Sequence, residues 1–207
     1  MQCYAPFLTE SALDIDGRCR LCRSGLTEFD ALYCVGAYEG RLRELIHLFK
    51  YAPMERLHRP LGAFLRTGLP REATFDLIVP MPLHRKRQRE RGFNQAELLA
   101  QEVARVASLP VELAVTRTRY TVQQAGLTGK QRRNNVRDAF EVKDPARVAG
   151  KRILLVDDVV TTGASANSCA LALKRAGASF VAVLALARAD RRIGAGPEAA
   201  IAHPHLV

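Results

Sequence analysis

Two adjacent carboxylates and a group of small, hydroxyl-bearing residues lie close together in the C-terminal third of the chain. Asp157 and Asp158 follow the apolar stretch ILLV at 153–156, which predicts a strand buried on both faces. The loop after the acids contains Thr161, Thr162, Gly163, Ala164 and Ser165, and a helix is expected to follow. Free amides at a helix N-terminus attract anions, so the stretch 153–165 predicts a phosphate site.

The two acids limit which phosphate compounds this site is expected to bind. Ionised carboxylates accept hydrogen bonds from a pair of sugar hydroxyls, so Asp157 and Asp158 suit a ligand with a sugar beside its phosphate. The stretch has neither the Lys of a Walker A loop nor the three glycines of a dinucleotide-binding turn. A buried strand closed by an ordinary acidic turn is the alternative.

A second site is expected after the apolar stretch FDLIV at 75–79, which predicts a buried strand closed by Pro80 and Pro82. A loop with five cations follows: Arg85, Lys86, Arg87, Arg89 and Arg91. So many cations repel one another unless an anion lies among them, and pyrophosphate is the natural candidate. The alternative is a solvated basic helix start.

Helices and strands alternate along the chain, which predicts a doubly wound parallel sheet with the ligand at the carboxyl ends of the strands. Helices are expected at 40–51, at 55–66 with Pro60 as an interruption, at 94–109 and after 163; further strands are expected at 111–115 and 180–187. In the first helix the buried face is predicted to hold Leu42, Leu45, Ile46, Leu48 and Phe49, with Arg41, Arg43 and Lys50 outside. In the third, Leu98, Leu99, Val103, Val106 and Ala107 are expected to be buried.

The N-terminal segment has the cysteine spacing of a zinc knuckle. Cys19 and Cys22 form a C-x-x-C pair, and Cys3 can supply a third thiolate. Cys34 is the nearest candidate for a fourth ligand, but it lies in a predicted strand and is expected in the core. The segment therefore predicts either a structural zinc site or a degenerate finger without metal.

Composition and charge limit the class of protein. The 207 residues are 48% hydrophobic and 25% charged, which is typical of a globular chain. No signal pattern or membrane-spanning apolar run is present, so we expect a cytoplasmic protein without membrane insertion. The 31 basic and 21 acidic residues give a net charge of +10, which favours a polyanionic partner over a merely solvated basic surface.

The stretch ILLVDDVVTTGAS closely resembles the signature of type I phosphoribosyltransferases, which bind 5-phosphoribosyl 1-pyrophosphate (PRPP). The resemblance implies that Asp157 and Asp158 hold the ribose hydroxyls and are the catalytic acids, and that 161–165 hold the 5′-phosphate. It also implies that Mg²⁺ accompanies PRPP. Purine-salvage members have an acid at the position of Thr161, so its absence argues against a simple purine-salvage enzyme.

The basic loop, with the form P-L-H-x-x-R-x-x-x-R-G-F-N-Q, resembles the ComF family in particular, which includes ComFC and GntX-like proteins. This resemblance assigns pyrophosphate binding to Leu83, His84, Arg85, Arg87 and Arg91. It continues through a stretch with little apolar periodicity, where a flexible loop that closes over PRPP is expected to include Arg117, Gln124, Leu127, Arg132 and Asn135. A basic loop without such a role is the alternative.

The resemblance predicts three parts: a Cys segment at 1–33, a phosphoribosyltransferase-like domain at 34–190 and a tail at 191–207. Three functions follow from different classes. The first is a ComF-like factor of natural transformation that binds single-stranded DNA and acts with other competence or helicase proteins. The second is an active transferase that moves the phosphoribosyl group to an unidentified base or amine; the third is a zinc-stapled interaction module. The aromatic content of 6% offers no clear base-stacking platform, and the oligomeric state is open, a homodimer included.

Overall fold

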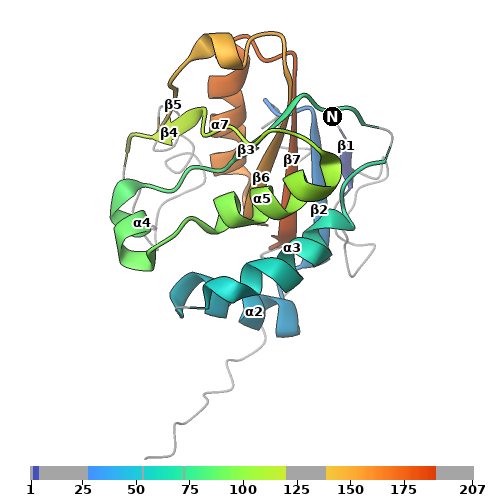
Figure 1. Ribbon diagram of the computed structural model, residues 1–207, viewed down its shortest axis with the longest axis vertical. Coiled ribbons are helices and arrows are strands. Elements are labelled where there is room, and N and C mark those ends of the chain that lie inside the picture. Colours follow the sequence, from blue (N-terminus) through green and yellow to red (C-terminus); the bar gives the residue numbers. More distant parts are fainter. Residues whose placement is uncertain (1, 5–27, 53, 72, 120–138, 190–207) are drawn as a thin grey trace, which may run out of the picture.

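The computed structural model describes residues 2–4, 28–52, 54–71, 73–119 and 139–189. Their central feature is a parallel sheet of five strands in the order β1-β2-β7-β6-β3 (Figure 1). The strands are β1 Gln2–Tyr4, β2 Ala31–Ala37, β3 Leu77–Pro80, β6 Arg152–Val160 and β7 Phe180–Arg188. All four strand pairings are parallel, so the predicted doubly wound sheet is confirmed.

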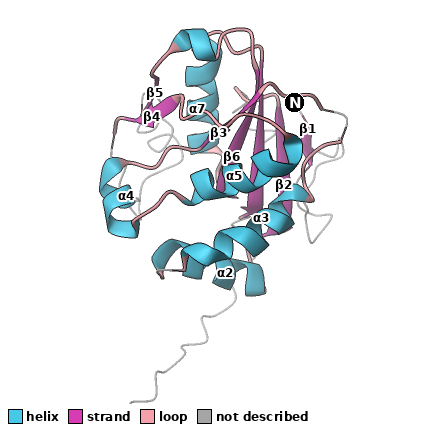
Figure 2. Cartoon of the chain, in the orientation of Figure 1, coloured by secondary structure: helices cyan, strands magenta, loops and turns pink. Residues whose placement is uncertain are grey.

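Helices cover both faces of this sheet (Figure 2). One face packs against α2 Gly40–Tyr51, α3 His58–Arg66 and α5 Gln95–Ala107; the other packs against α7 Ala164–Arg175 and the antiparallel pair β4 Val115–Arg117 and β5 Phe140–Val142. Alternate residues of β6 divide between the two cores, with Ile153 and Leu155 in one and Leu154 and Val156 in the other. Burial on both faces explains the unbroken apolar run in the sequence.

The remaining elements are short. A 3-10 turn, η2 Glu55–Leu57, leads into α3, so the predicted interruption comes before Pro60, which lies in the first turn of α3, where proline is tolerated. A second 3-10 turn, η3 Pro145–Arg147, precedes β6, and α4 Arg85–Arg91 follows β3. No helix among the described residues is both long and apolar enough to cross a bilayer.

Three details differ from the sequence expectations. The buried residues of α2 are only Ile46 and Phe49, whereas Leu45 and Leu48 are 39% and 41% exposed. In α5 the expected core residue Val106 is 62% exposed. The apolar spacing was correct for a helix, but only a narrow stripe of each helix meets the sheet. The stretch 111–115 forms one isolated bridge through Val111, and the strand begins only at Val115.

Candidate functional site

A cavity of about 490 Å³ lies at the carboxyl ends of β3 and β6. Five parts of the chain supply its walls: the end of β6 with the start of α7, the segment from β3 into the first turn of α5, Tyr38 after β2, the second half of α2, and Arg117 of β4. The carboxyl edge of a parallel sheet is where ligands bind in open α/β folds. The fold therefore brings the two predicted sites, far apart in sequence, to one cavity.

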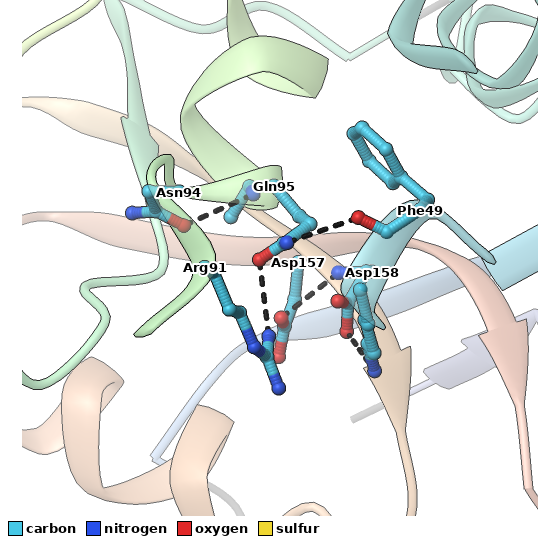
Figure 3. Close-up of polar contacts among 8 residues, drawn as sticks. Phe49, Arg91, Asn94, Gln95, Asp157 and Asp158 are labelled. Carbon is cyan, nitrogen blue, oxygen red and sulfur yellow. Dashed lines mark hydrogen bonds and ion pairs between the residues drawn. The ribbon is translucent and has the colours of Figure 1, made fainter. Parts of the chain in front are cut away.

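The adjacent acids of β6 lie at the floor of this cavity and face different neighbours. Asp158 is 9% exposed and forms a 3.0 Å ion pair with Lys50 Nζ of α2. The Asp157 carboxylate accepts a 2.8 Å hydrogen bond from the backbone N–H of Asp158 (Figure 3). Because β6 continues to Val160, both acids belong to the strand itself and not to a loop after it. A strand holds their backbone in place, which favours a preformed site.

Asp157 is a half-buried residue of the cavity wall. Burial, followed by the charge of Asp158, raises the pKa of Asp157 to about 7. Lys50 and Arg117 act in the opposite direction and favour the charged form. Cys169 of α7 lies close enough that its own pKa is raised, first by burial and then by the charge of Asp157. A ligand that donates hydrogen bonds to Asp157 would stabilise its ionised form.

The predicted phosphate loop joins the acids to α7. Residues 161–165 all line the cavity. Gly163 caps the helix with φ 73°, a left-handed conformation that suits glycine. The twelve-residue α7 begins at Ala164, so its first amides and the positive end of its dipole lie at the cavity wall. This arrangement of backbone N–H groups and hydroxyls suits a phosphate.

The basic run, expected as a loop, forms the seven-residue helix α4. Arg, Lys, Gln and Glu are good helix formers, the His84 side chain caps the N-terminus by accepting from Lys86 N–H, and Gly92 ends the helix at φ 81°. Arg87 and Arg91, one turn apart, both line the cavity. The nearby cations also affect one another: burial, followed by the positive charge of Arg87, lowers the pKa of Arg117.

A chain of hydrogen bonds fixes Arg91. Its Nη1 donates to Gln95 Oε1 at 3.0 Å, and Gln95 Nε2 donates to the Phe49 carbonyl at 3.1 Å (Figure 3). Gln95 is 1% exposed, and the Arg91 guanidinium also lies 5.2 Å from the Tyr51 ring centroid. Asn94, predicted as a helix cap, accepts from Ala96 N–H and donates to the Met81 carbonyl, which ties α5 to the end of β3.

Most of the predicted site residues that the structure describes meet in the cavity. They are Leu83, Arg87, Arg91, Arg117, Asp157, Asp158, Thr161, Thr162, Gly163, Ala164 and Ser165. His84 and Arg85 do not line it. Gln124, Leu127, Arg132 and Asn135 lie outside the described residues, as do Cys19 and Cys22; only the backbone of Cys3 is described, in β1. Within the described ranges no group of three metal-ligating side chains occurs, and Cys34 is buried in the core as expected.

Several residues of the cavity were not predicted from the sequence. The prediction for Lys50 was wrong: it was expected to point outward, but it follows Ile46 by one helical turn and so shares the buried face of α2. Gln95 looked like an ordinary residue of an amphipathic helix. Tyr38, His47 and Tyr51 also line the cavity, and nothing in their local sequence signals this.

Comparison with known families and proteins agrees with this geometry. A model of the phosphoribosyl transferase domain matches residues 94–202. Competence protein F of Haemophilus influenzae is 34% identical over 180 residues, 83% of this chain and 78% of that protein. DNA utilization protein YhgH of Escherichia coli K12 is 35% identical over 180 residues, 82% of this chain and 77% of that protein.

Competence protein ComFC of Bacillus subtilis is 34% identical over 101 residues, 49% of this chain and 39% of that protein. The domain match includes both acids, the phosphate loop and α7, and the two longer alignments extend the similarity over most of the chain. The chain belongs to the ComF family of proteins with the type I phosphoribosyltransferase fold.

Proposed function

We propose that the protein binds PRPP in the cavity at the carboxyl edge of the sheet. The observation that carries this proposal is the convergence of two carboxylates, a helix N-terminus and two arginines of α4 on one cavity. PRPP has one group for each: a ribose diol, a 5′-phosphate and a pyrophosphate. A simple phosphate site would have no use for two adjacent carboxylates, because like charges repel.

In the proposed complex, Asp157 and Asp158 accept hydrogen bonds from the ribose hydroxyls, and the amides and hydroxyls of 161–165 donate to the 5′-phosphate. Arg87 and Arg91 bind the pyrophosphate, with Leu83 beside it. Mg²⁺ prefers phosphate and carboxylate oxygens and water, so the residues present suit a magnesium complex of PRPP, in which the metal would neutralise part of the pyrophosphate charge. Lys50 holds the Asp158 carboxylate in position through their ion pair.

We infer that the biological role lies in DNA uptake during natural transformation, with binding of single-stranded DNA. The support comes from relatives that are named competence proteins or DNA utilization proteins and that align over most of this chain. The net charge of +10 agrees with a polyanionic partner. Other competence or helicase proteins are the expected protein partners.

A second candidate is catalysis: displacement of pyrophosphate from PRPP by a base or amine. Tyr38 and Tyr51 favour it, because two aromatic side chains in the cavity wall offer a flat acceptor a surface to pack on. The departing pyrophosphate would be stabilised by Arg87 and Arg91, and the cationic sugar that develops would lie beside the two carboxylates. Closure of residues after Arg117 would exclude water.

A structural zinc ion held by Cys3, Cys19 and Cys22 is proposed separately for the N-terminal segment, on the spacing of its cysteines alone. Metal analysis of the purified protein tests it. About one zinc per chain, lost in Cys19→Ser/Cys22→Ser, is the expected result. Protein purified with no zinc, and unaffected by zinc addition, would contradict it.

Calorimetric titration with PRPP and Mg²⁺, with and without a short single-stranded DNA, tests the main proposal. We expect saturable PRPP binding and DNA binding that weakens steeply with salt. PRPP binding with no affinity for DNA would favour the transferase. Absence of PRPP binding would contradict the assignment of the cavity.

A further inference from the structure

Helix α4 carries its arginines on two opposite faces. Arg87 and Arg91 are half-buried and line the PRPP cavity. Arg85 and Arg89 are likewise one helical turn apart, but they are exposed and lie about 200° around the helix from Arg87. One short helix thus presents one arginine pair to the cavity and another to solvent, and the PRPP site accounts only for the first.

The outward pair lines a hollow of its own. An open depression of about 420 Å³ is bounded by Arg85, Gln88, Arg89 and Gly92. Among the described residues no carboxylate forms an ion pair with either arginine. The acid of α4, Glu90, is exposed and does not line the hollow. Two guanidinium groups and a side-chain amide therefore face this hollow with their donors available.

We propose that this outer face of α4, formed by Arg85, Gln88 and Arg89, binds the phosphodiester backbone of single-stranded DNA. The proposal rests on the proposed DNA-binding function and names its surface. Guanidinium groups bind phosphate oxygens in bidentate fashion, and a glutamine amide adds a neutral donor. None of the described residues that line the hollow is aromatic, so the contact we expect is with the backbone and not with the bases.

This geometry makes the two proposed ligands neighbours. The pyrophosphate of PRPP would contact α4 from the cavity side, and the DNA backbone would contact it from the solvent side. Mutual repulsion among the cations of α4 is reduced when phosphates lie on both faces. Binding through phosphates alone is independent of sequence and depends strongly on salt, since each neutralised phosphate releases counterions.

Fluorescence anisotropy with a labelled oligothymidine of about 30 nucleotides tests this surface. The variant is Arg85→Ala/Arg89→Ala, and the matched control is Arg41→Ala/Arg43→Ala, which removes two exposed arginines from α2. All four positions are solvent-exposed in helices, so alanine should preserve the fold, and thermal melting verifies this.

Loss of two phosphate contacts should weaken binding about 10-fold or more at 0.1 M salt and reduce the slope of log K against log salt by about 1.4. The α2 control should stay within about twofold of the wild type, with an unchanged slope. If both variants weaken binding equally, or neither does, the assignment of DNA binding to the outer face of α4 is wrong, although the protein itself still binds DNA. A wild-type protein that does not bind the oligonucleotide would overturn both this surface and the DNA-binding function.

Discussion

Lys50 of α2 and Asp158 of β6 form an ion pair of 3.0 Å between Nζ and Oδ1, with side chains only 16% and 12% exposed. Burial alone would lower the pKa of Lys50, but the charge of Asp158 and the hydrogen bond to it raise the pKa above its ordinary value. The pair fastens α2, which forms part of the cavity wall, to the strand that carries both acids. It therefore serves stability and the shape of the site together.

We expect Lys50→Met to destabilise the protein by about 2 kcal/mol, because Asp158 would remain buried without its counter-charge. The double variant Lys50→Met/Asp158→Asn should recover a large part of this loss, since no unpaired charge is left. Urea unfolding of the wild type, both single variants and the double variant gives the coupling free energy. Strictly additive effects would show that the ion pair contributes nothing to stability.

The raised pKa of Asp157 predicts a pH-dependent stability. The folded chain keeps a proton on Asp157 up to about pH 7, whereas the unfolded chain releases it near the ordinary aspartate pKa of 3.8. Stability from this group is therefore present at low pH and is lost as the pH rises towards 7. In Asp157→Asn this loss is absent, and its amide oxygen can still accept from the Asp158 N–H.

We compare the unfolding free energy of Asp157→Asn with that of the wild type at each pH. The difference in favour of the variant should grow by about 2 kcal/mol from pH 5 to pH 8. Unfolding by urea at several pH values in this interval provides the measurement. A difference between variant and wild type that stays constant from pH 5 to pH 8 would refute the raised pKa.

Gln95 is expected to position Arg91 without contacting PRPP. Gln95→Leu removes the acceptor for Arg91 and leaves the Phe49 carbonyl without its donor, so PRPP affinity should fall about 10-fold and stability by about 1 kcal/mol. The control is Gln101→Leu, which makes the same change at an exposed position of α5. PRPP affinity is measured by calorimetry. Equal affinity in the two variants would show that Gln95 does not position Arg91 for PRPP binding.

Gly62 should matter for the fold and not for the cavity. A Cβ at this position of α3 would press against the Glu102 Cβ and lie 2.6 Å from its Cγ, and Glu102 is held by Arg105 at 2.6 Å. Alanine is a better helix former than glycine, yet Gly62→Ala should destabilise the protein by about 1 to 3 kcal/mol through this overlap. An increase in melting temperature would contradict this prediction and show that α3 and α5 can move apart slightly at little energetic cost.

The part of the site that could be predicted from the sequence is continuous in the chain. A buried strand, two acids and a helix start follow one another in 153–165, so local patterns place Asp157, Asp158 and the phosphate loop without knowledge of the packing. The strand order, in contrast, depends on which faces meet. The alternation of strands and helices indicated a parallel sheet, and no local pattern indicated that β7 lies between β2 and β6.

The residues that were missed depend on contacts between distant elements. Lys50 looks like a surface lysine until β6 places a carboxylate beside it, and Gln95 becomes a support for Arg91 only because α2 presents the Phe49 carbonyl. The division of the basic run into two faces also required the structure. A loop was expected there, and only a helix sends Arg87 and Arg85 in opposite directions.

The most direct test of the PRPP site is calorimetric titration of Asp157→Asn/Asp158→Asn with PRPP and Mg²⁺, beside the wild type. Each amide preserves the shape of the side chain but has no charge and replaces one acceptor oxygen by a donor, so the pair can no longer form the charge-assisted hydrogen bonds to the ribose hydroxyls. We expect a variant that melts cooperatively, as the wild type does, and has no measurable affinity for PRPP. An affinity equal to that of the wild type would contradict the assignment of the two acids.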